Sequence, residues 1–120
     1  MMATPNIINT STVNGNLAVL SANTVGMSNV VINSVGSGQL IKINTVTIAN
    51  YNTSAVSANV DVYRGGAGYL INGNIVIPGQ SMLMGLTKDS SIYLNEGDSL
   101  RANVGVNNSI HITVSYDVYI

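Results

Sequence analysis

Turn-forming dipeptides recur along this chain and constrain its fold more than any other feature. Asn-Gly at 72–73 supplies the positive φ of a type I′ hairpin turn, and Pro-Gly at 78–79 suits a type II turn. Short segments rich in Val, Ile and Tyr separate these turns, and such composition is typical of strands. We predict turns at residues 36–38, 50–53, 64–66, 72–73, 78–79, 95–97 and 107–108.

The segments between the turns predict an all-β protein. Residues 56–64 and 110–119 alternate apolar and polar side chains, so one face of each strand belongs to the core. In residues 39–50 the alternation changes phase near 43–45, which predicts a bulge. The expected strands are 17–22, 30–34, 39–50, 56–64, 69–71, 75–77, 81–86, 91–94, 99–106 and 110–119. Their lengths and spacing predict a sandwich or a barrel without a helix of useful length, and the fold that we expect is an antiparallel β-sandwich, jelly-roll or Ig-like.

The first 16 residues differ from the rest. They are rich in Asn, Thr and Ser, are broken by Pro5 and show no sustained apolar period. We therefore expect residues 1–16 to be an extended N-terminal arm and residues 17–120 to be a single β-sandwich domain. Two adjacent isoleucines in the arm need an apolar partner, which makes this stretch a candidate interface. Its candidate contact residues are Pro5, Asn6, Ile7 and Ile8.

Charge is scarce in this sequence. Hydrophobic residues make up 46% of the chain, but only 8% of residues are charged, and the net charge is -1. Typical soluble domains carry about 25% charged residues, so little repulsion keeps copies apart. The four cations are scattered, which argues against nucleic acid and anionic membranes as partners. Self-association or docking on another protein is the expectation that follows.

The chain has few residues of the types that carry out catalysis. It has no Cys, and its single histidine, His111, lies in a strand where we expect a surface or interface position. Residues 64–68 are rich in Gly but lack the helix that a phosphate loop requires, so they predict a hairpin tip. Glu96 and Asp98 predict a solvated turn, with a calcium site as the alternative. We expect no enzymatic activity, no metal and no cofactor.

Six tyrosines provide all the aromatic side chains apart from His111. Tyr63 falls on the polar face of its strand, and we expect it to contribute to an interface together with Tyr119. Tyr93 and Tyr116 continue apolar rows, which predicts positions in the core.

Residues 34–120 resemble a group of small β-structured virion proteins of tailed bacteriophages, familiar from phages of cyanobacteria and other aquatic bacteria. The order and spacing of several pieces carry the resemblance, more than any single piece. These pieces are 43–50 (INTVTIAN), 60–63 (VDVY), 77–81 (IPGQS), 92–98 (IYLNEGD) and 112–116 (ITVSY). The resemblance implies a structural role and no catalytic residues.

Composition and resemblance together predict a capsid decoration or cement protein. Such a protein binds the major capsid protein on the surface of the assembled head and stabilises the shell. We expect synthesis in the host cytoplasm, since the N-terminus lacks a secretory signal pattern, and a homo-oligomer, with a trimer favoured. The alternatives are a tail, neck or fibre component and, from another class, a carbohydrate-binding module that uses Tyr51, Tyr69 and the Asn-rich turns.

Overall fold

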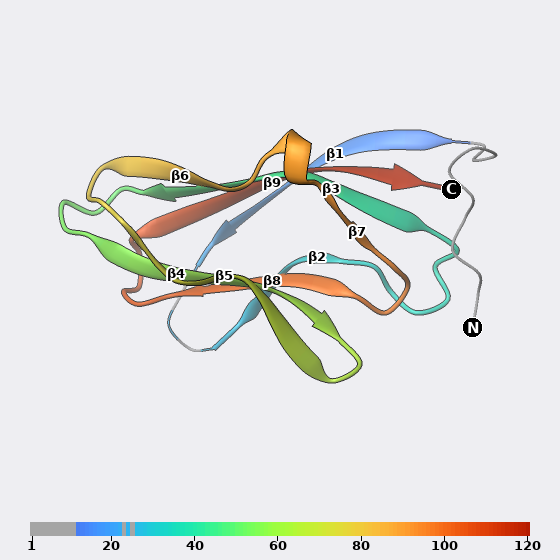
Figure 1. The fold of residues 1–120 in the computed structure, drawn as a ribbon, viewed down its shortest axis with the longest axis horizontal. Helices are drawn as coiled ribbons and strands as arrows, with labels where there is room; N and C mark the ends of the chain where they lie inside the picture. The colour runs from blue at the N-terminus through green and yellow to red at the C-terminus, as the bar shows by residue number, and fades with distance from the viewer. Residues whose placement is uncertain (1–11, 23, 25) are drawn as a thin grey trace.

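The computed structural model describes residues 12–22, 24 and 26–120, most of which belong to two antiparallel β-sheets. The sheets pack face to face as two layers (Figure 1), so the predicted all-β sandwich is confirmed. Within the described ranges the only helical element is the 3₁₀ turn Lys88–Ser90, and no helix there has the length and apolar character that crossing a membrane requires. The predicted contact residues Pro5, Asn6, Ile7 and Ile8 lie outside the described residues.

The strand bounds follow the sequence signals closely. The strands are β1 (Val13–Ser21), β2 (Ser28–Ile32), β3 (Leu40–Asn50), β4 (Val56–Arg64), β5 (Ala67–Ile77), β6 (Ser81–Leu86), β7 (Ile92–Leu94), β8 (Ser99–Val104) and β9 (Ile110–Tyr119). The predictions for β4, β6 and β9 match residue for residue. β1 begins four residues before the expected strand at 17–22, because Val13 already pairs with Tyr119 of β9.

The order of the strands identifies the type of sandwich. The five-stranded sheet runs β1-β9-β3-β6, with β7 also paired to β3, and the four-stranded sheet runs β2-β8-β4-β5. β6 and β7 share the edge beside β3, so together they act as one interrupted strand. Most connections then cross from one sheet to the other. This is the arrangement of a jelly roll, which the sequence had left open against an Ig-like sandwich.

The core fills the space between the sheets. Ile43, Val46 and Ile48 of β3 are fully buried, and so are Val60 and Leu100 of the opposite sheet. Ile43 and Val46 are three positions apart, which strict alternation would place on opposite faces. The pairing of β3 with β9 shifts register between positions 43 and 45, so the predicted bulge is confirmed and both side chains reach the core.

One predicted turn is wrong. β5 continues through residues 72–73, where a hairpin was expected. The chain has already reversed at Gly65 and Gly66, which both have positive φ, and β5 stays paired with β4 on either side of the Asn-Gly pair. The extra residues are absorbed by register shifts, and the Asn74 N–H donates to the Asn59 side-chain oxygen at 2.6 Å. The Asn-Gly signal therefore marks an irregularity within a strand.

Candidate interaction surfaces

The two tyrosines predicted at an interface lie on different sheets. Tyr63 is in β4, on the outer face of the four-stranded sheet, and the Arg101 guanidinium lies 4.1 Å from its ring centroid. Arg101 donates two hydrogen bonds to the buried Asp61 carboxylate, at 2.9 and 2.6 Å. One face of the Tyr63 ring is thus covered within the chain itself. Tyr119 is in β9 of the five-stranded sheet, where Val13 of β1 lies opposite it.

The two tyrosines predicted in the core have different outcomes. Tyr116 packs against the core, as expected. Tyr93 is 43% exposed, so its assignment to the core is wrong. The three-residue strand β7 instead places Leu94 in the core, with Ile92 packed against it. Tyr93, between them, points to the other side and lies opposite Lys42 in the pairing with β3.

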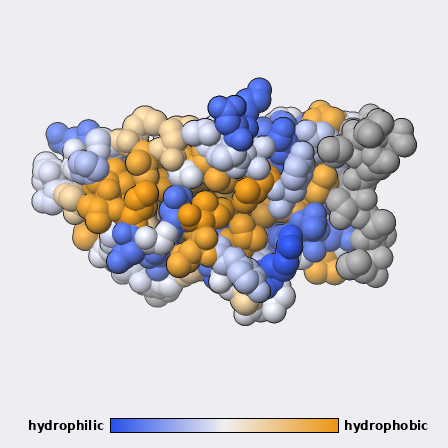
Figure 2. All heavy atoms as spheres, in the orientation of Figure 1, coloured by the Kyte–Doolittle hydropathy of each residue, from blue (hydrophilic) through white to orange (hydrophobic). Residues whose placement is uncertain are grey.

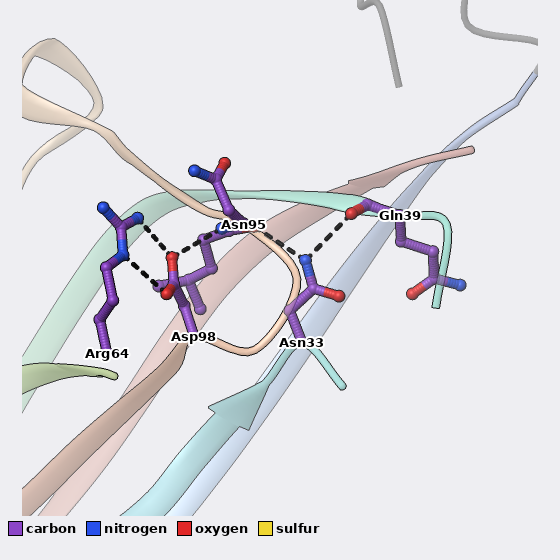
Figure 3. A network of polar contacts seen from close by, with 6 residues as sticks. Asn33, Gln39, Arg64, Asn95 and Asp98 are labelled. Atoms are coloured by element: carbon purple, nitrogen blue, oxygen red, sulfur yellow. Dashed lines mark hydrogen bonds and ion pairs between the residues drawn. The ribbon is translucent and has the colours of Figure 1, made fainter. Parts of the chain in front are cut away.

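The turn at residues 95–98 is engaged in the fold, so the prediction of a solvated turn is wrong. Asp98 is only 2% exposed, and its carboxylate accepts hydrogen bonds from Arg64 Nε at 2.8 Å and Nη2 at 2.5 Å (Figure 3). It also accepts a hydrogen bond from the Asn95 N–H. Burial raises the pKa of Asp98, but these hydrogen bonds and the charge of Arg64 outweigh it, so the pKa lies below its ordinary value.

Asn33 ties a second loop to the same end of the sandwich. Its buried side-chain amide donates to the carbonyl oxygens of Gln39 and Leu94, at 3.0 and 2.9 Å (Figure 3). The Glu96 carboxylate accepts a hydrogen bond from the Gly38 N–H at 2.5 Å. These polar groups hold two loops together and offer no reactive arrangement. The sequence analysis missed Asn33, because a single Asn after a strand reads only as a turn residue.

The outer face of the five-stranded sheet is almost free of charge. Three successive cross-strand rows are Leu17–Ser115–Thr45, Val19–Thr113–Thr47–Met84 and Ser21–His111–Ala49–Met82. Leu17 and Val19 are 66% and 72% exposed. The nearest charged side chains, Lys42 and Asp117, lie directly opposite each other in the pairing of β3 with β9. This face therefore presents methyl and hydroxyl groups to its surroundings.

A groove of about 460 Å³ lies where the open side of the sandwich separates β5 from β7. Figure 2 shows apolar side chains gathered across the middle of this side of the molecule. The groove is lined by Val62, Arg64, Tyr69, Leu70, Ile71, Ile92 and Tyr93. Its size is within the range of small-molecule sites, but its wide mouth and single charged group provide few directional contacts.

His111 is exposed, which confirms a surface position, and its ring stacks on Tyr51 with centroids 4.4 Å apart. Tyr51 lines a different depression from Tyr69, so the pair invoked for sugar binding is not brought together. In the part of the chain that the structure describes, no group of three or more His, Cys, Asp or Glu side chains is placed to hold a metal ion.

Comparison with known proteins identifies a fold and no family. No family model matches the sequence, and no curated protein matches it. A solved structure of Bacillus endospore appendages, described as a family of disulfide-linked pili, matches with a TM-score of 0.53 and 12% identity, over 90% of this chain and 85% of that one. The Eiger TNF from S. frugiperda covers 88% of this chain and 91% of its own at 9% identity, but its TM-score of 0.34 supports no argument. The first likeness shows that the chain shares an all-β sandwich fold with this appendage protein.

Proposed function

We propose that this chain is a non-enzymatic structural protein, a repeated building block of a larger particle, and most specifically a decoration protein on a bacteriophage head. The observation that carries the proposal is the set of three uncharged rows on the outer face of the five-stranded sheet. Across three rows it offers Val, Leu, Ala, Met, Thr and Ser side chains together with His111, and no Asp, Glu, Lys or Arg. A face of this kind is typical of contact with another protein.

The opposite face of the sandwich differs, which supports a single docking side. The outer side of the four-stranded sheet carries the Asp61–Arg101 ion pair and the bonded amides of Asn59 and Asn103. These polar groups bond to one another, and although Ile32 and Val76 are also exposed on this side, it carries charged side chains that the three rows of the other sheet lack. We infer that the five-stranded sheet faces the capsid protein and that the four-stranded sheet faces the solvent.

The structural neighbour supports the coarser part of this proposal. It is described as forming pili, which are assemblies of many subunits, and the two proteins share a fold. This chain has no Cys, so copies of it cannot be joined by disulfides. Its assembly would depend on non-covalent contacts repeated over a lattice, where many weak contacts act together. A tail or fibre position remains the alternative site on the particle, and the trimer predicted from sequence competes with the two-fold pairing proposed below, which the mass in solution decides between.

The number of copies per particle tests the proposal. Quantitative mass spectrometry of purified phage particles should give a ratio to the major capsid protein that is near the lattice stoichiometry. A few copies per particle would move the chain to the neck, tail or fibres, and its absence from particles would refute the virion role.

Two matched variants test which face docks. Thr113→Asp introduces a charge in the middle row of the five-stranded sheet, and Asn29→Asp introduces the same charge on the outer face of the other sheet, beside Arg101. We expect Thr113→Asp to abolish binding to particles stripped of the protein and Asn29→Asp to bind normally. Equal binding by both variants would contradict the assignment of the docking face.

A further inference from the structure

β1 is an edge strand with an unusually regular free side. Thr12 and Ile120 exchange both backbone hydrogen bonds, and the Ala22 N–H donates to the Ile110 carbonyl oxygen. In an antiparallel pair, such bonds alternate along the strand. The even-numbered residues of β1 therefore bond to β9, and the odd-numbered residues point their N–H and C=O groups away from the sheet. These residues are Val13, Gly15, Leu17, Val19 and Ser21, and no described strand pairs with that side.

The other edges of the sandwich are interrupted, as protected edges usually are. β2 has five residues and a register shift. β5 contains two register shifts against its neighbour and a residue with positive φ, Asn74. β6 shifts register beside Gly85. β1, in contrast, has nine residues (VNGNLAVLS) without a charge, a proline or a register shift. No other described edge strand is both as long and as regular as β1. A matching edge is therefore offered only by β1 of a second copy of this chain.

We propose that β1 pairs with β1 of a second copy of this chain, antiparallel and about a two-fold axis that passes through Leu17. Leu17 would then lie opposite the partner's Leu17 on the outer face. Val19 would lie opposite the partner's Gly15, so that a large side chain meets the space left by a small one. A Cβ added at position 15 would lie in ordinary contact with the Asp117 carboxylate, 3.5 Å from its Oδ1, and would meet no backbone atom, so the partner's Val19 would pack beside that carboxylate.

The pairing satisfies the exposed backbone groups of both edges. Each outward residue pairs with one across the axis, so the strands would exchange about ten backbone hydrogen bonds, as many as a standard interface carries. No charged side chain on β1 opposes the contact. The two five-stranded sheets would become one continuous sheet, and each copy would contribute its three uncharged rows to the shared outer face. The inference rests on the proposed function, since it names the partner in that assembly as a second copy.

Cysteine cross-linking tests the register directly, because the chain has no native Cys. In the proposed dimer the Cα atoms of Leu17 and the partner's Leu17 are about 5.5 Å apart, within reach of a disulfide. The Cα atom of Val19 is displaced from the partner's Val19 by roughly 14 Å along the strands, which is out of reach. Leu17→Cys should therefore oxidise to a covalent dimer at least about tenfold faster than the matched control Val19→Cys.

A second variant removes the pairing and leaves the fold intact. The Leu17 N–H points away from β9, so Leu17→Pro removes no hydrogen bond within the chain. By light scattering after size exclusion, the unmodified chain should have the mass of a dimer and Leu17→Pro the mass of a monomer, with the same circular dichroism spectrum. Should Leu17→Pro fail to fold, Leu17→Lys tests the same contact by placing two like charges opposite each other.

Several results would overturn the pairing. Equal cross-linking by the two cysteine variants would do so, as would a trimer mass or a dimer that persists in Leu17→Pro and Leu17→Lys. A monomeric Leu17→Cys variant whose introduced thiol is shielded from reagents would also do so, because another segment or protein would then occupy the edge. Loss of the pairing while the chain is present at lattice stoichiometry on particles would refute this inference alone. A cross-linked dimer that is absent from particles would refute the virion role alone.

Discussion

Replacing Arg64 by Gln should destabilise the fold through the carboxylate that it leaves behind. Arg64 makes a two-pronged contact with Asp98, whose side chain is 3% exposed, whereas the Arg64 side chain is 55% exposed. Removing one partner of a buried pair costs about 3–5 kcal/mol. Because the guanidinium is half in water, its attraction is partly screened, and we expect a loss of about 2–3 kcal/mol in the free energy of unfolding at pH 7.

The destabilisation should depend on pH. In the parent chain the pKa of Asp98 is lowered on folding, so its contribution to stability is present above the unfolded pKa of about 3.9 and is lost as pH falls through that value towards the folded pKa. In Arg64→Gln the burial remains without the cation, which raises the pKa of Asp98 above its unfolded value. In the variant, protonation of Asp98 at low pH therefore costs no stability, because it removes a buried charge that has lost its cation. The difference between the two proteins should therefore shrink from pH 7 to pH 3.5.

Urea unfolding followed by circular dichroism at pH 7 and pH 3.5 measures this difference. A loss of about 2–3 kcal/mol corresponds to a fall in Tm of roughly 8–15 °C for a domain of this size. Lys42→Gln is the matched control, because it removes the same charge from a residue with no ion pair within the described part of the chain. A loss below about 0.5 kcal/mol at pH 7, or the same loss at both pH values, would refute the reasoning.

Three further substitutions test the packing of the sandwich by the same unfolding assay. Asn50→Ala removes a buried amide that donates to the carbonyl oxygens of Ser54, Ile77 and Pro78, and it should cost about 2–4 kcal/mol; a loss under about 1 kcal/mol would show that water replaces it. Gly79→Ala would drive a Cβ into the backbone carbonyl of Thr53, so we expect a loss above about 3 kcal/mol, and an unchanged Tm would contradict the tight contact. Ile112→Ala opens a cavity in a fully buried site and should cost about 3–5 kcal/mol, whereas a near-neutral result would mean that the core collapses around it.

Local sequence patterns predicted most of the strands and misread features that depend on distant partners. β4, β6 and β9 were placed correctly because alternation of two residues and flanking turns are local signals. The Asn-Gly pair at 72–73 carries the same local signal as a true hairpin. What decides its role is whether β4 still lies alongside, and β4 is specified by residues far from the pair.

The polar networks escaped prediction for a related reason. Asp98 has the sequence context of an exposed turn, and its burial is possible only because Arg64, 34 positions away, is brought beside it. Likewise, Asn33 bonds to the Leu94 carbonyl across 61 positions. The sequence indicated a docking protein from its low charge, but it did not indicate which face is uncharged. That follows from the register of β1, β9, β3 and β6.

The arrangement of the charged side chains has a kinetic consequence. The cations are interspersed with anions: Arg64 and Arg101 form ion pairs with Asp98 and Asp61, Lys42 lies across from Asp117 in the strand pairing, and Lys88 precedes Asp89 in the chain. Interspersed charges of opposite sign and a net charge of -1 give no large field of one sign, so we expect no long-range attraction between subunits. Collisions should then lead to association at the unassisted rate of about 10⁵–10⁶ M⁻¹s⁻¹. The growth of an assembly would follow the concentration of subunits and would change little between dilute buffer and strong salt.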